Sequence, residues 1–306
     1  MDQLFDASLL TSTLRMIAPI LLAALGGAVC ARVGIFNVAL EGLMLTGAFT
    51  AIVGNHILGN VWLAVLFAMV CVMLMSLLLA YLTIHLNANM IVVGVALNFL
   101  ATGLTTFCLF AIFNVKGSYY DQEMKGLPQW EIPLLENIPF LGGVLSGHSP
   151  LVYLAFAAAA LLQFFFFRTV KGFRLLAAGE NPAAARSLGL KVSRIQYGAV
   201  LLSGALCGLA GAQLSLGQVT LFTENMTAGR GFIALVASML GQNNPLGVVL
   251  SSLLFGFMDA VSIRLQGLSL PTQFTAMVPY VMTLLAMLFF KDRAYLQQSG
   301  RIEGKS

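Results

Sequence analysis

The sequence of 306 residues is poor in charge and in residues that bind metals. Only 9% of the residues are charged, against about 25% in an average soluble domain, which excludes a large water-exposed surface. The three histidines, His56, His85 and His148, are isolated from one another, so the sequence predicts no metal site and no cofactor. The four cysteines lie inside apolar runs without a Cys-x-x-Cys pair and are interpreted as small buried hydrophobic residues.

The sequence also has little that indicates catalysis. Residues 300–306 (GRIEGKS) resemble a phosphate loop, but they have three residues between the glycines where four are needed. Residues 229–234 fit a dinucleotide fingerprint without the βαβ unit that gives it meaning. No nucleophile triad or carboxylate pair is evident. We therefore predict that the chain is not an enzyme and does not itself hydrolyse ATP.

What the sequence has in abundance is long hydrophobic runs. The chain is 59% hydrophobic with a mean hydropathy of +0.90, and a membrane span needs about 20 mostly apolar residues. Only helices are credible at these lengths, so the predicted fold is all-α, a polytopic transmembrane helical bundle forming one domain over residues 1–306. The runs cover residues 9–31, 35–54, 61–84, 90–113, 150–167, 196–217, 231–241, 245–266 and 273–290.

The run at 231–241 is too short to cross a membrane alone. The following Asn243-Asn244-Pro245 predicts a turn, because proline lacks an N–H and favours the first turn of a new helix. The sequence therefore predicts a broken or re-entrant helix pair here.

Two polar stretches, 114–149 and 168–195, are long enough to lie outside the bilayer. The first holds two lysines against four acidic residues, and the second holds six cations against Glu180 alone. The positive-inside rule puts 168–195 in the cytoplasm, and the single crossing at 150–167 then makes 114–149 extracytoplasmic. This grouping of cations follows membrane topology, so the net charge of +4 does not indicate nucleic acid binding.

Residues 181–189 predict a short helix with defined ends inside the cytoplasmic stretch. Asn181 is a candidate N-cap, Pro182 fits the first helical position, and Gly189 can close the C-terminus. Two turns of helix are marginal in water, so neighbouring helices or a partner must hold it. A loop that only sets topology would explain the cations, but it would not explain these caps or the apolar Ala184 and Leu188 four residues apart.

Polar residues inside the apolar runs have two interpretations. Asn37 and Glu41 share a helical face, Asn98 interrupts 90–113, and Asp259 interrupts 245–266. Each either makes a hydrogen bond between helices or belongs to a solute path, because an unpaired polar group in a membrane is costly. Asp259 and Arg264 also have the spacing to neutralise each other.

The polar run at 218–231 is predicted to lie at the outer mouth, where it would contact a polar solute or form an ordinary loop. It offers a stacking ring together with amide, hydroxyl and charged groups, from Phe222, Glu224, Asn225, Thr227 and Arg230.

Several segments together resemble a known family. They are 34–49 (GIFNVALEGLMLTGAF), 89–105 (NMIVVGVALNFLATGLT), 172–190 (GFRLLAAGENPAAARSLGL), 202–247 (beginning LSGALCGLAGAQLSLGQVTLF) and 253–266 (LLFGFMDAVSIRLQ). In these the chain resembles the inner-membrane permeases of ABC importers for nucleosides and simple sugars, and the shorter permease of nucleoside importers in particular.

The resemblance implies a short cytoplasmic helix that docks on an ATPase subunit and couples ATP binding to opening of the path. Its coupling residues would be Arg174, Gly179, Glu180, Asn181, Pro182, Ala183, Ala184, Arg186 and Gly189. The implied partners are ATP-binding cassette ATPase subunits, a second paralogous permease, an extracytoplasmic substrate-binding protein and the lipid of the bacterial inner membrane.

The implied solute is a purine nucleoside or, next, a ribose-like sugar. Two other functions remain open from the residues alone. One is a proton-coupled secondary transporter that uses Glu41 or Asp259, and the other is a passive channel, which would need a ring of polar residues along a pore.

Overall fold

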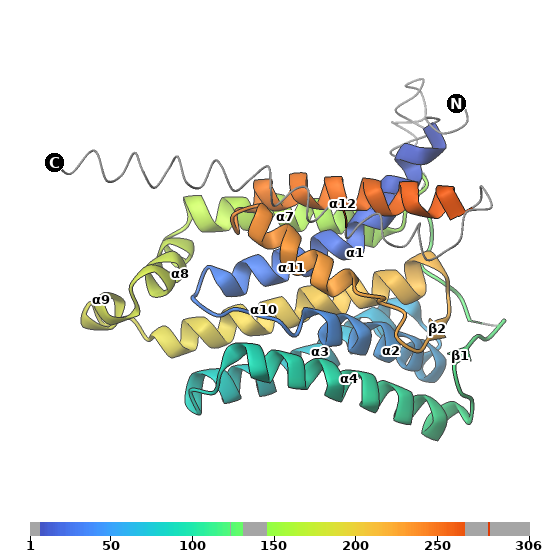
Figure 1. Ribbon diagram of the computed structural model, residues 1–306, viewed down its shortest axis with the longest axis horizontal. Coiled ribbons are helices and arrows are strands. Elements are labelled where there is room, and N and C mark those ends of the chain that lie inside the picture. The colour runs from blue at the N-terminus through green and yellow to red at the C-terminus, as the bar shows by residue number, and fades with distance from the viewer. Residues whose placement is uncertain (1–6, 123, 131–145, 267–280, 282–306) are drawn as a thin grey trace.

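The computed structural model describes residues 7–122, 124–130, 146–266 and 281, and within these the chain is a bundle of helices (Figure 1). Six of the helical segments are long and apolar enough to cross a membrane: Leu9–Ala31, Val61–His85, Met90–Phe113, Pro150–Arg168, Val192–Gln218 and Pro245–Leu265. The predicted all-α polytopic membrane fold is confirmed. The predicted run at 273–290 lies outside the described residues, apart from Val281.

The helices follow the hydrophobic runs closely. Their bounds are α1 Ala7–Ala31, α2 Leu40–Leu58, α3 Val61–Ala80, α4 Met90–Phe113, α7 Pro150–Arg168, α8 Val170–Glu180, α9 Pro182–Ser187, α10 Val192–Ala212, α11 Arg230–Leu240 and α12 Pro245–Gln266. Two π-helical turns, η1 Tyr81–His85 and η2 Gln213–Gln218, extend α3 and α10, and the two-residue strands β1 Ser118–Tyr119 and β2 Phe222–Thr223 pair antiparallel.

Asparagine side chains set the starts of three helices. The side chains of Asn60 and Asn89 accept hydrogen bonds from backbone N–H groups in the first turns of α3 and α4. Asn181 does the same for α9, where its Oδ1 accepts from Ala184 N at 3.0 Å. These are standard N-caps, which satisfy backbone donors that a helix start leaves unpaired.

Two helices, α2 and the short α11, begin part-way along the bundle. The run predicted at 35–54 becomes helical only at Leu40, and residues 35–39 are irregular. Figure 1 shows α2 in the half of the bundle toward β1 and β2, and α11 in the half toward α8 and α9. The short α11 and the turn before Pro245 were predicted correctly. The late start of α2 was not predicted.

The polar stretch 168–195 holds two helices instead of the predicted one. The predicted helix is present as α9, and Gly189 has the left-handed φ of +80° expected at its end. α8 precedes it and is capped by Thr169, whose Oγ1 accepts from Gly172 N at 3.0 Å. Two glycines and three charges in eleven residues concealed α8 in the sequence.

Small residues let α10 pack at the centre of the bundle. A Cβ atom at Gly208 would lie 2.9 Å from the Cα of Met69 on α3, and one at Gly211 would collide with the backbone of Met44 and Ala48 on α2. Such close backbone contacts are the usual way for membrane helices to associate, because lipid provides no hydrophobic force between them. The glycine stripe on α10 thus brings α2 and α3 onto one central helix.

We expect Gly211→Leu to destabilise the purified protein by about 1–3 kcal/mol, because the added side chain has no space between α10 and α2. Gly103→Leu on α4 is the matched control, since a Cβ at Gly103 meets no atom within 4 Å. Thermal unfolding in detergent measures both variants. Equal melting temperatures for the two would contradict the packing described here.

Candidate functional site

The carboxylate of Glu41 lies where the helices α2 and α11 begin. Its Oε1 accepts hydrogen bonds from Thr227 Oγ1 at 2.6 Å and Gly229 N at 2.9 Å, and its Oε2 accepts from Gly231 N at 2.6 Å. Glu41 is itself in the first turn of α2 and is 8% exposed. The carboxylate therefore faces the positive ends of two helix dipoles at once, which is the favourable place for a negative group.

Glycine allows the two helix starts to approach this closely. A Cβ at Gly231 would collide with the backbone of Glu41, and Gly229 has a left-handed φ of +83°. Any larger residue at 231 would push α11 away from the carboxylate. The sequence Gly229-Arg230-Gly231, which formally resembled a nucleotide fingerprint, instead forms the seat for Glu41.

Asn98 and Asn37 hold the irregular chain that leads into α2. Asn98 Oδ1 accepts from Gly42 N at 2.8 Å, and its Nδ2 donates to the carbonyl of Val38 at 3.0 Å. Asn37 Oδ1 accepts from Ala39 N at 3.0 Å, and its Nδ2 donates to Ser203 Oγ at 3.1 Å. The structure thus gathers Asn37, Glu41, Asn98 and Thr227 around the start of α2. All four make hydrogen bonds that satisfy backbone or side-chain groups of this break.

Arg230 pairs with Asp259 rather than standing free at a mouth. Arg230 Nε lies 3.2 Å from Asp259 Oδ2, and the two side chains are 20% and 15% exposed. The spacing of Asp259 and Arg264 had suggested that these two neutralise each other. The ion pair joins the start of α11 to α12, next to the Glu41 carboxylate.

The other predicted mouth residues lie at the end of the bundle that holds β1 and β2. Phe222 is fully buried and meets Phe49 edge to face, with ring centroids 5.1 Å apart. Glu224 Oε1 accepts from Gly117 N at 2.9 Å, and Asn225 is exposed with a φ of +57°. Phe222 and Glu224 therefore fasten residues 219–224 to the loop after α4. Nearby, burial raises the pKa of Tyr119, and Asp121 raises it further.

The short helix α9 is held by apolar contacts and presents an exposed face. Ala185 packs with Ala178 of α8 and Val192 of α10. The remaining predicted coupling residues Asn181, Pro182, Ala183, Ala184, Arg186 and Gly189 are exposed, as are Arg174 and Glu180, and Leu188 is 80% exposed. The predicted apolar pair Ala184 and Leu188 is thus exposed.

Gly179 connects this loop to the end of α1. A Cβ at Gly179 would collide with the carbonyl of Arg32, and it would lie 3.0 Å from the Cα of Val33. The same turn is held by Gln196 Nε2, which donates to Val33 O at 3.2 Å, and by Arg32 Nε, which donates to Asn243 O at 2.8 Å. The end of α8 therefore rests directly on the turn that starts the irregular segment before α2. Sequence reasoning predicted Gly179 but missed Arg32, Gln196 and Ser203.

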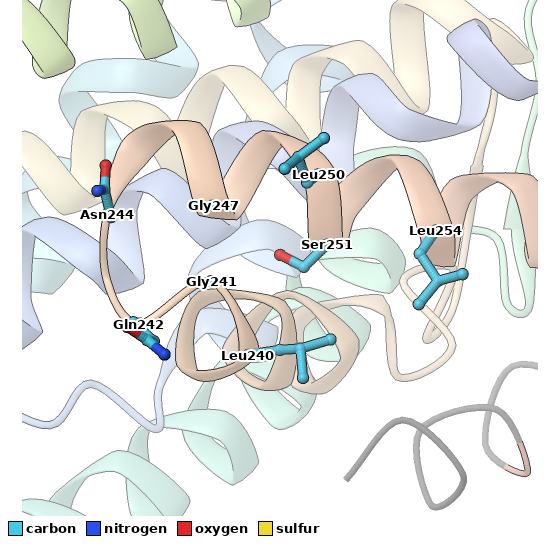
Figure 2. A pocket seen from close by; sticks show the side chains of 8 residues that line it. All are labelled: Leu240, Gly241, Gln242, Asn244, Gly247, Leu250, Ser251 and Leu254. Atoms are coloured by element: carbon cyan, nitrogen blue, oxygen red, sulfur yellow. The ribbon is translucent and has the colours of Figure 1, made fainter. Parts of the chain in front are cut away.

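Two hollows lie at opposite ends of the bundle. One of about 320 Å³ lies at the turn from α11 to α12, where Figure 2 shows Leu240 and Ser251 near one another and Gln242 and Asn244 along the turn. The other, of about 330 Å³, lies between α1, α12 and the loops after α4 and is polar, with Thr11, Ser12, Arg15, His148 and Arg264 in its lining. None of the predicted mouth residues lines either of these two hollows.

The family to which the chain belongs is shown by comparison with known proteins. The family model described as branched-chain amino acid transport system permease component matches residues 9–287. The chain belongs to this permease family. Three relatives are a nucleoside ABC transporter permease of Lactococcus lactis (37% identity; 90% of each chain), a guanosine ABC transporter permease of Bacillus subtilis (36%; 92% of each) and a putative glucose ABC transporter permease of Haloferax volcanii (36%; 87% of this chain, 80% of the relative).

The fold of this permease is also that of a solved transporter. A structure titled as an inward-facing conformation of a putative metal-chelate type ABC transporter matches with a TM-score of 0.55. The match covers 91% of this permease and 85% of the solved chain at 15% identity, and at that identity it supports the fold alone. The permease is a multi-pass membrane protein.

We expect Glu41→Gln to lower the stability of the permease by about 2 kcal/mol. The new amide group would point an N–H donor at a backbone N–H donor whose hydrogen bond a carboxylate oxygen accepts in the unaltered protein. Glu41→Ala should cost more, since it leaves three buried donors without an acceptor. Glu180→Gln is the control, because Glu180 is exposed. Thermal unfolding of the purified variants decides, and a Glu41→Gln protein as stable as the control would contradict the role of the carboxylate.

Proposed function

We propose that this chain is the permease subunit of an ATP-driven importer that moves nucleosides into the cytoplasm across the inner membrane. The exposed, capped helix α9 carries this proposal, because a transporter that works alone has no need of an apolar docking face outside the bilayer. The nucleoside and guanosine permeases among its relatives favour a nucleoside. A relative named for glucose keeps a simple sugar as the second candidate solute.

The proposed orientation follows the cations. Residues 168–195, with α8 and α9, lie in the cytoplasm, and β1 and β2 lie at the extracytoplasmic end. Figure 1 supports this, since α8 and α9 project from one end of the bundle and β1 and β2 lie at the other. ATP hydrolysis takes place in separate ATPase subunits that bind α9.

The proposed partners cover surfaces that the chain leaves open. Beside the ATPase, a substrate-binding protein would deliver the solute at the outer end, and a second, paralogous permease would complete the membrane unit. α4 presents exposed Phe99, Phe107 and Phe110, an apolar surface suited to lipid or to a second permease.

The coupling mechanism runs through the contact between Gly179 and Arg32. When the ATPase moves α9, α8 moves with it, because Ala178 packs on Ala185. The end of α8 presses on the Arg32 turn, and residues 35–39 can transmit this shift to the start of α2, since they lead directly from that turn into α2. There Glu41 joins α2 to α11, so both helices move together. ATP binding drives this movement only to the extent that ATP binds the two conformations of the complex with different affinities.

The solute path in this proposal passes the start of α2 and α11. Asn98, which is partly exposed, Thr227 and the Arg230–Asp259 pair offer polar groups in the middle of the bundle. A permease should hold a neutral solute weakly, because tight binding would trap it. The predicted path residues around the start of α2 bind helix ends in this state, and the joint movement of α2 and α11 would turn their polar groups toward the solute.

We expect uptake by liposomes containing the full complex to persist when an uncoupler collapses the proton gradient, and to stop when ATP is withheld. The reason is that energy enters through the docked ATPase and not through protonation of Glu41 or Asp259. Uptake of radiolabelled guanosine, with ribose and glucose as competitors, measures both the coupling and the solute. Uptake that follows the proton gradient without ATP would select a secondary transporter.

We expect Gly179→Leu to lower uptake by about tenfold while the ATPase still co-purifies, because the new side chain pushes α8 off the Arg32 turn but leaves α9 exposed. Leu188→Glu should instead lose the ATPase, since it places a charge in the docking face. Gly103→Leu, in open space on α4, is the control for both. Normal uptake by Gly179→Leu would remove the proposed coupling contact.

A further inference from the structure

A groove lined by four cations lies where α8 folds back beside the start of α10. It has a volume of about 510 Å³, and Lys171 and Arg174 of α8 meet Lys191 and Arg194 in its lining. No acidic residue lines the groove, and none of the four cations makes an ion pair with any described residue. Four positive charges without a counter-charge in one groove indicate an anionic ligand.

The floor of the same groove is apolar and belongs to membrane-spanning helices. It includes Phe165 of α7 and Leu202 of α10, which is 39% exposed. Leu202 is ten residues into α10, which is about 15 Å along the helix axis at 1.5 Å per residue. The groove therefore starts among cations at the end of the bundle and continues along an apolar surface toward the middle of the membrane.

A glycine leaves the floor open. Gly198 is exposed, and a Cβ added there would meet no atom within 4 Å. It lies between Arg194 and Leu202, one helical turn from each, so the cationic end and the apolar end form one continuous surface.

We propose that this groove binds an anionic phospholipid of the cytoplasmic leaflet. The phosphate headgroup lies among Lys171, Lys191, Arg194 and Arg174, the last of which the family resemblance also assigns to ATPase coupling, and an acyl chain follows Gly198 and Leu202. Basic pockets between membrane helices suit such headgroups, because they combine charge with contact to lipid. Only the choice of leaflet rests on the orientation proposed above.

Membrane topology alone does not account for this arrangement. Arg168 and Arg186 belong to the same polar stretch and satisfy the positive-inside rule equally well, yet neither lines the groove. A topological signal needs cations anywhere in the loop, whereas four of the six converge on one groove with an apolar floor. The bound lipid would hold α8 against α10, and so fix the helix that carries α9.

The test compares variants of the full importer complex purified from membranes, with bound lipids counted by native mass spectrometry. We expect Lys171→Gln with Arg194→Gln to weaken retention of phosphatidylglycerol or cardiolipin by about 30-fold, as expected for two basic residues at an anionic headgroup. Arg168→Gln with Lys116→Gln removes the same charge outside the groove and leaves the predicted coupling residues unchanged, so this variant should retain lipid like the unaltered complex.

A second pair of variants tests the apolar floor without changing charge. Gly198→Leu should also reduce retention, because its side chain fills the acyl channel, whereas Gly103→Leu should not. If millimolar inorganic phosphate displaces the ligand and Gly198→Leu has no effect, the groove is a free-anion site and the proposal is wrong. If the Lys171/Arg194 variant loses the ATPase but keeps its lipid, the groove is an ATPase contact and the proposal is equally wrong.

Equal lipid retention by all variants would also contradict the lipid site. So would equal binding of the complex to anionic and zwitterionic vesicles. ATP-driven uptake by the unaltered complex is measured on the same preparations. A failure of the lipid proposal therefore stays separate from a failure of the proposed transport function.

Discussion

The Glu41 carboxylate is the interaction on which the rest of this bundle depends. A helix that starts inside a membrane leaves several backbone N–H groups without water to bind them. In this chain α2 and α11 start beside one another, and Glu41 accepts three hydrogen bonds at the start of α11 while its own backbone belongs to the first turn of α2. Gly231 and Asn98 complete the junction, the first by its small size and the second by accepting from Gly42.

α2 and α11 therefore meet at a single joint. Residues 35–39 connect α1 to the joint without helical stiffness, and the turn at Arg32 is in contact with α8 through Gly179. A displacement of α8 and α9 thus has a continuous route of packed backbone to the Glu41 junction.

The sequence predicted those features that depend on local pattern. The apolar runs, the Asn181 cap and the turn before Pro245 all follow from residues near one another. The late start of α2 does not follow from local pattern, because Ile35, Val38 and Ala39 are apolar and continue the hydrophobic run. The side chain that binds the non-helical backbone of Val38 belongs to Asn98, which is distant in the sequence. Asn37, Glu41 and Asn98 were recognised as unusual from their cost in a membrane, but their partners were not visible. α8 was hidden because its glycines and cations are typical of loops.

The central claim is that α9 and the joint at Glu41 move together through Gly179. Spin labels at Ser187→Cys on α9 and Phe232→Cys in the first turn of α11, both exposed positions, would report the distance between them in the full complex, with Cys71 and Cys108 replaced by serine. The account predicts that ATP binding changes this distance in the otherwise unaltered permease and leaves it unchanged when Gly179→Leu is added. A distance that ignores ATP, or that responds equally in both proteins, would contradict it.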